Sequence, residues 1–253
     1  MVKTSTFSPS PLSPKRWPAE SFRWYWSLGF AFLIIAAQLI PGALFGAALL
    51  VFGVARESDL RIFSWPLLAA TFASYVVALA ILFAALPLLA HRSLRELGLR
   101  MPRLDDLGWG IGGALAMVAV AALVGSLQER VFHLKADEVQ VQMLRAARGS
   151  LVGGFVFLAC VAAPFFEELT FRGFVFNALL RYLPVWLAVI LAGAVFGLAH
   201  WLPGNLGAIV PLAAVGMVLA AIYYRTASLV AVMLAHAFFN LLTVAAVLAL
   251  HQL

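Results

Sequence analysis

Long apolar runs constrain the fold of this chain more than any other feature of its sequence. Each run has about 18 or more residues, the length that a helix needs to cross a hydrocarbon layer about 30 Å thick. The runs are continuous and do not alternate between apolar and polar residues, which excludes a membrane β-barrel. We therefore predict an all-α fold, a polytopic transmembrane helical bundle. Seven spans are predicted, at 25–54, 64–90, 108–127, 151–180, 184–201, 206–224 and 228–250. A break at Pro41, inside the first run, would make eight.

The composition agrees with a chain that lies mostly in lipid. Hydrophobic residues make up 64% of it and charged residues 11%, which leaves too little polar surface for a soluble domain. The net charge of +6 is explained by Lys and Arg in cytoplasmic loops, so we predict no nucleic-acid partner. Counting Lys and Arg in alternating loops places ten on the N-terminal side and six opposite, which favours a cytoplasmic N-terminus. The single cysteine, Cys160, is predicted to be a packing residue.

The polar segments divide the chain into a tail and one membrane domain. Residues 1–24 are rich in Ser and Pro and carry basic side chains, and we predict a disordered tail that is not a signal peptide. Residues 25–253 form the predicted transmembrane domain. Within this domain, 91–107 is expected to be a polar connector and 128–150 a polar or surface-lying amphipathic helix.

Five ionisable side chains lie well inside the predicted spans, and they are the first candidates for function. They are Glu167, Glu168, Arg172, His200 and His236. A charge at the bilayer centre costs about 2.5–3.5 kcal/mol on insertion scales, so such residues need partners or a water-filled cavity. Glu168 and Arg172 are four residues apart, a spacing that allows an ion pair on one helix face. Glu167 points about 100° away and is free to face something else.

The two histidines each have a companion one helical turn away. His200 ends the stretch FGLAH, one turn after Phe196, and His236 begins the stretch HAFFN, one turn before Asn240. Counting the helical rise from the connecting turns places these side chains and Glu167 at a similar depth in the membrane. We therefore predict that three spans bring them together.

A carboxylate, two imidazoles and an amide at one depth suit the attack of water on a carbonyl carbon. Glu167 would take a proton from water, His200 would hold or relay it, and His236 with Asn240 would donate hydrogen bonds to the oxyanion. Neither a G-x-S-x-G elbow nor an HExxH zinc motif occurs. The alternative is a divalent metal such as zinc, held by Glu167, His200 and His236 with a water in the open position. We prefer the version without a cofactor, because Asn240 is a poor zinc ligand and a good hydrogen-bond donor.

Three short motifs resemble those of a known family. The stretches EELTFR, FGLAH and HAFFN resemble the ordered motifs EExxxR, FxxxH and HxxxN of the CPBP intramembrane proteases, which include type II CAAX prenyl endopeptidases and bacteriocin-processing or immunity proteins. The resemblance covers about residues 91–243, and the motif-bearing core is 151–243. It implies a catalytic role for Glu167 and His200 and an oxyanion-stabilising role for His236 and Asn240. Glu168 and Arg172 take the family's supporting positions, and Phe196 is expected to pack beside the site.

The resemblance implies a membrane-embedded endopeptidase of either the glutamate or the metallo type. Its expected partners are membrane lipid and a peptide or prenylated protein substrate, and its expected location is the bacterial cytoplasmic membrane. Two other functions stay open at this stage. One is a non-catalytic immunity or scaffold protein with the same fold, and the other is a proton-coupled transporter that uses Glu167 and the histidines as a relay.

Overall fold

The fold consists of helices joined by short turns and loops in the residues that the structure describes, which are 24–54, 64–90, 94–135, 139–201 and 206–250 of this computed structural model. Within these ranges no strand occurs, which confirms the predicted all-α class. The predicted tail lies outside them, except for its last residue, Trp24. The helices are α1 (Trp24–Val51), α3 (Trp65–Ala90), α4 (Leu104–Phe132), α5 (Val139–Ala146), α6 (Ser150–Phe157), α7 (Ala163–Glu168), α8 (Asn177–Tyr182), α9 (Val185–Ala199), α10 (Leu206–Thr226) and α11 (Leu229–Leu250).

Four helical stretches of the described chain are long and apolar enough to cross a membrane. They are α4, the continuous stretch Ser150–Tyr182, α10 and α11, and α9 and the first part of α3 are shorter apolar helices. These helices identify an integral membrane protein. The number of spans, seven or eight, stays a prediction, although α1 runs through Pro41 as one helix.

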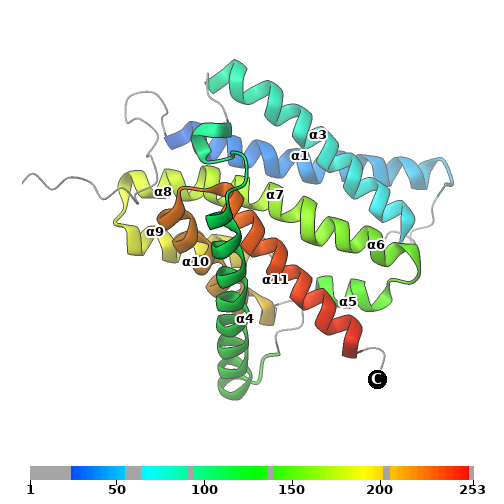
Figure 1. The fold of residues 1–253 in the computed structure, drawn as a ribbon. Coiled ribbons are helices and arrows are strands. Elements are labelled where there is room, and N and C mark those ends of the chain that lie inside the picture. The colour runs from blue at the N-terminus through cyan, green and yellow to red at the C-terminus, as the bar shows by residue number, and fades with distance from the viewer. Residues whose placement is uncertain (1–23, 55–63, 91–93, 136–138, 202–205, 251–253) are drawn as a thin grey trace, which may run out of the picture.

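The central helix of the bundle is interrupted twice by π-helical turns. It runs from α6 through a first π segment (Leu158–Ala162) to α7, and then through a second π segment (Leu169–Phe176) to α8 (Figure 1). A π turn adds a residue to the helical turn, so it rotates the following side chains and leaves some carbonyls without their usual partner. The two glutamates of the first motif lie in α7, the short α-helical piece between these segments.

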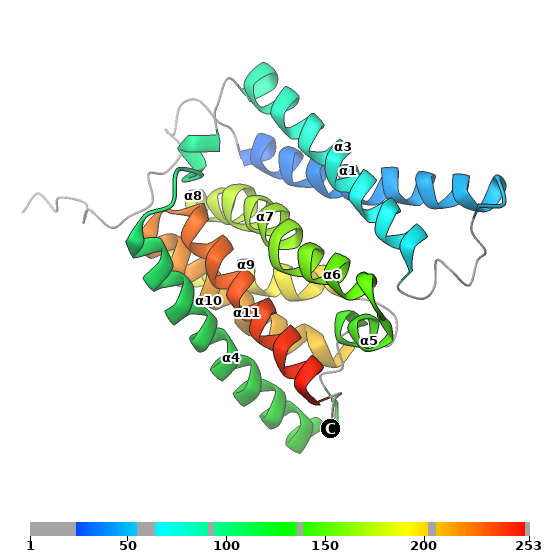
Figure 2. The ribbon, with the colours of Figure 1, turned by 45° about the vertical axis from the view of Figure 1, so that its right-hand side comes forward.

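The central helix separates two groups of helices. On one side α1 and α3 pack against each other, and α1 also contacts the second π segment. On the other side α4 packs on α11 and α10, and α10 packs on α9, as Figure 2 shows. Close approach of α4 to its neighbours depends on Gly113, where a Cβ atom would come within 2.6 Å of Ile222 and 2.9 Å of Ala235.

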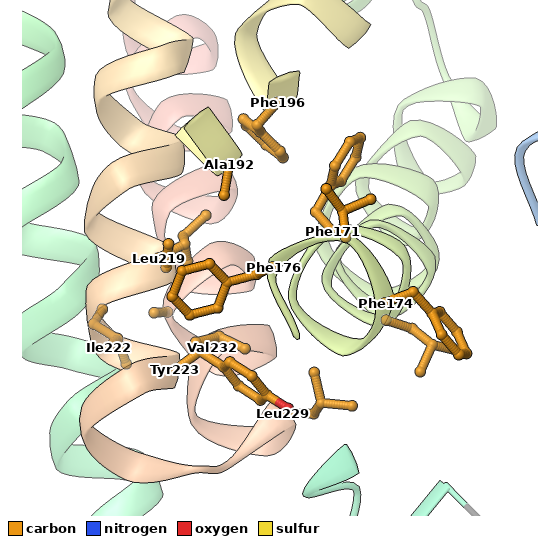
Figure 3. Packing of buried hydrophobic residues seen from close by; sticks show 14 of the residues in the cluster. Phe171, Phe174, Phe176, Ala192, Phe196, Leu219, Ile222, Tyr223, Leu229 and Val232 are labelled. Atoms are coloured by element: carbon orange, nitrogen blue, oxygen red, sulfur yellow. The ribbon is translucent and has the colours of Figure 1, made fainter. Parts of the chain in front are cut away.

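Phenylalanines of the second π segment fill the space around the central helix. Figure 3 shows Phe171 pointing towards Phe196 of α9 and Phe176 towards α10, while Phe174 points to the opposite side of the helix. The rings of Phe171 and Phe196 meet edge to face at 5.2 Å, and Phe174 and Phe196 are at most 1% exposed. This aromatic packing fixes the rotation of the helix that carries both motif glutamates and Arg172.

A buried carboxylate joins the connector before α4 to the turn between α10 and α11. Asp106 accepts hydrogen bonds from Arg100 at 2.6 and 2.8 Å, from the Arg103 backbone N–H at 2.8 Å and from the Ser228 hydroxyl at 2.8 Å. Its side chain is 2% exposed, so all of these donors depend on one anion. This network holds the start of α4 against the start of α11.

We expect Asp106→Ala to lower the free energy of unfolding by about 1–3 kcal/mol, because the substitution leaves buried donors without an acceptor. Thermal unfolding of the detergent-solubilised protein measures the effect. The matched control is Asp105→Ala at the exposed neighbouring acid, which should change stability by less than about 0.5 kcal/mol. Equal stability of the two variants would show that the network is not a structural anchor.

Candidate active site

The centre of the site is the carboxylate of Glu168, which is fully buried. Its Oε1 atom accepts a hydrogen bond from Arg172 Nη1 at 3.1 Å and lies 2.7 Å from His236 Nδ1. Its Oε2 atom lies 3.1 Å from Arg172 Nε. The predicted pair of Glu168 and Arg172 is therefore present, and His236 of α11 joins it from a separate helix.

Arg172 is held on its other side by α9 and α10. Its Nη2 atom donates to the Gly216 carbonyl at 2.9 Å, and its guanidinium carbon lies 4.6 Å from the centre of the Phe196 ring. Gly216 permits this arrangement, since a Cβ atom there would come within 2.9 Å of Phe196 Cβ. Phe196 thus packs beside the site, as predicted, and connects Arg172 to both histidines. Its ring centre is 4.7 Å from that of His200 and 5.9 Å from that of His236.

Glu167 and His200 face each other across a short gap. Glu167 Oε2 lies 3.7 Å from His200 Nε2, too far for a direct hydrogen bond. This oxygen is buried, and it has no hydrogen-bond partner among the described residues. His200 Nδ1 lies 2.8 Å from the Phe196 carbonyl oxygen, which can only accept, so Nδ1 carries a hydrogen. In the neutral ring Nε2 then presents a lone pair to the carboxylate.

Asn240 satisfies a carbonyl that the first π segment releases. The backbone N–H of Ala163 bonds to Leu158, five residues back, so it is not available to Ala159. The next residue, Pro164, has no N–H. The Asn240 side-chain amide donates to this Ala159 carbonyl at 2.6 Å. One N–H of the amide therefore joins α11 to the first π segment, and the second remains for a ligand.

All four predicted catalytic side chains, Glu167, His200, His236 and Asn240, line one cavity. Its volume is about 110 Å³, enough for several water molecules. The remaining walls are mainly apolar, and they include Val141 and Leu144 of α5. The helix predicted over 128–150 is thus shorter than expected, because residues up to Phe132 continue α4. The polar groups are thus gathered in one part of a largely apolar hollow.

The metal-assisted alternative would need Glu167, His200 and His236 as ligands. His236 directs Nδ1 to Glu168, and the nearest atoms of Glu167 and His200 are 3.7 Å apart, so these two contacts are compatible with either mechanism. Over the described ranges, no group of three or more His, Cys, Asp or Glu side chains lies close enough together to hold an ion. We therefore assign no catalytic step to a metal.

Three features of the site were not predicted from the sequence. The contact between Glu168 and His236 joins residues 68 positions apart and has no local signal. The contribution of α5 to the cavity wall was likewise not predicted, because it depends on tertiary packing. The carbonyl bound by Asn240 had a partial signal, because Pro164 in an apolar run indicates that a nearby carbonyl lacks its helical donor.

Comparison with known proteins agrees with the motifs. Residues 149–242 match the family model described as Rce1-like, type II CAAX prenyl endopeptidase. The predicted family resemblance is confirmed. The match covers all three motifs but not residues 91–148, to which the predicted resemblance extended. At the level of the family it indicates a CAAX-type intramembrane protease. No curated protein and no solved structure matches the chain.

We expect Asn240→Asp to destabilise the protein by about 1–3 kcal/mol, because an oxygen replaces the N–H that satisfies the half-buried Ala159 carbonyl. Thermal unfolding in detergent gives the measurement. Gln142→Glu, the same change from amide to acid at an exposed position of α5, is the control and should be nearly neutral. If Asn240→Asp unfolds at the wild-type temperature, the amide does not hold α11 to the π segment.

Proposed function

We propose that this protein is an intramembrane endopeptidase in which Glu167 activates water to hydrolyse a peptide bond. The observation that carries the proposal is the buried Glu167 oxygen, which faces His200 across 3.7 Å inside a cavity. A buried carboxylate oxygen without a donor is costly unless a proton, water or ligand satisfies it. Water that enters the cavity supplies that donor.

The first step is deprotonation of this water. Between Glu167 and His200, a water molecule finds an acceptor for each of its hydrogens, the carboxylate oxygen and the Nε2 lone pair. Its oxygen lone pairs are then directed away from both bases and towards a substrate carbonyl. Glu167 accepts a proton as the oxygen attacks the carbonyl carbon, and His200 keeps the water oriented.

The second step is stabilisation of the oxyanion that forms when the carbonyl double bond opens. Asn240 donates its second N–H, while its first stays on Ala159. His236 lines the same cavity and is the other donor candidate on α11. When the intermediate collapses, the C–N bond breaks and the proton held by Glu167 passes to the leaving amine, with His200 as a relay.

The substrate that fits this chemistry is a peptide or protein segment, prenylated or not, that reaches the cavity from the membrane. Apolar walls favour a segment whose side chains can leave water or lipid without an unpaired charge. We further propose that the protein lies in the bacterial cytoplasmic membrane with its N-terminus in the cytoplasm, on the basis of the loop charges.

Glu167→Gln tests the proposed base directly. The amide keeps the size of the side chain but cannot accept the proton, so cleavage should fall by about 10²-fold or more. Mass spectrometry of peptide and prenyl-peptide substrates, incubated with purified protein in detergent, measures the products. Glu129→Gln, at an exposed position of α4, is the matched control and should cleave like wild type. Unchanged cleavage by Glu167→Gln would remove this residue from the mechanism.

Metal analysis separates this mechanism from the metal-assisted alternative. After exhaustive dialysis against a chelator, the purified protein should keep its cleavage activity, because the proposed steps need only protein side chains. Elemental analysis of wild type and His200→Ala is made on the same preparations. Stoichiometric zinc that is bound by wild type and lost in His200→Ala would replace the metal-free mechanism by a zinc-dependent one.

A further inference from the structure

The environment of Glu168 determines its own ionisation state. Arg172 meets both carboxylate oxygens at 3.1 Å, and the two side chains are 1% and 0% exposed. An arginine in proteins stays protonated, and a buried cation of this kind is stable only beside an anion. Glu168 is therefore the anion of this pair. An ionised carboxylate can accept hydrogen bonds but cannot donate them.

From this geometry we infer that Glu168 is a positioning residue that fixes the proton and the orientation of the His236 ring. At 2.7 Å from an acceptor-only oxygen, His236 Nδ1 must carry a hydrogen and donate it. The ring is then held with Nε2 as the nitrogen left for the cavity, which His236 lines. In the neutral ring Nε2 has a lone pair, and it becomes a donor to an oxyanion only when it receives a second proton.

This assignment gives Glu168 and Arg172 a role in the reaction, although neither residue contacts the substrate. It rests on the proposed function, in which His236 faces the reacting carbonyl. Arg172 acts one step further back, because its bonds to Gly216 and its stacking on Phe196 keep the Glu168 carboxylate in place. The ionisable groups that share the cavity with His236 are Glu167 and His200, which face each other.

The wild-type protein itself provides the first test. Nitrogen NMR of protein labelled with ¹⁵N at histidine, in lipid or detergent, distinguishes a protonated from a bare ring nitrogen. The His236 signals are identified as those lost in His236→Gln. We expect a hydrogen on Nδ1, whether or not Nε2 also carries one. A bare Nδ1 would overturn the inference.

The second test removes the carboxylate without leaving a buried unpaired charge. The double variant Glu168→Met, Arg172→Met replaces both ions by apolar side chains of similar length, a change that folded proteins often tolerate. We expect Nδ1 to lose its fixed hydrogen and the ring to lose its fixed orientation. The variant also lacks the anion that favours the doubly protonated, donating form of His236, so kcat for peptide cleavage should fall by about 10²-fold while KM changes much less. Glu168→Asp, which retains a carboxylate, should keep more activity than the double variant.

The outcomes separate this inference from the proposed function. An unchanged Nδ1–H signal in the double variant would show that Glu168 does not set the tautomer. Equal loss of kcat in the double variant and in Glu168→Asp, or a loss confined to KM, would show that Glu168 does not position His236 for catalysis. If wild type cleaves no peptide, the protease proposal fails, but the NMR result still decides whether Glu168 fixes the ring.

Discussion

The pairing of one fully buried carboxylate governs the structure around the site. An ion in an apolar interior is tolerated only when charge and hydrogen bonds compensate the loss of water. Glu168 meets this requirement through Arg172 on its own helix and His236 on α11. Arg172 in turn needs the Gly216 carbonyl of α10. A single charge thus specifies how three helices must meet, whereas apolar contacts alone would permit many registers.

The irregular backbone of the central helix is the second constraint, and side-chain amides resolve it. Within a membrane each carbonyl without a helical donor needs another partner. Asn240 serves Ala159 beside the first π segment, and Asn177 donates to carbonyls of the second. The same solution recurs in α10, where Pro211 removes the donor for Gly207 and Gln128 replaces it at 2.7 Å. In each case the amide also ties the irregular turn to its surroundings.

Much of this arrangement could be predicted from the sequence, because apolar length and local spacing are one-dimensional properties. The predicted spans 206–224 and 228–250 agree with α10 and α11 to within about two residues, and Glu168 pairs with Arg172 four positions on. The π segments could not be predicted, since they depend on which neighbouring groups satisfy the released carbonyls. The contact of Glu168 with His236 on α11 could not be predicted either, because the two residues lie far apart in the sequence. The spacing of four residues assigns Glu168 to Arg172, but no local spacing indicates which histidine shares the carboxylate.

The direction in which each side chain points explains why the adjacent residues Glu167 and Glu168 have different environments. On a helix they point about 100° apart, so only one of them can lie against Arg172. Glu168 takes that position, with Arg172 at 3.1 Å from both of its oxygens and His236 at 2.7 Å from Oε1. Glu167 instead turns to the cavity, where His200 lies 3.7 Å from its Oε2 atom. A carboxylate held against a buried arginine is a poor base, while one that faces a cavity can accept a proton from water that enters it. The EExxxR motif therefore combines a structural carboxylate, Glu168, with the base that we propose, Glu167. Through its contact with His236, Glu168 also orients a ring that lines the cavity where Glu167 would act.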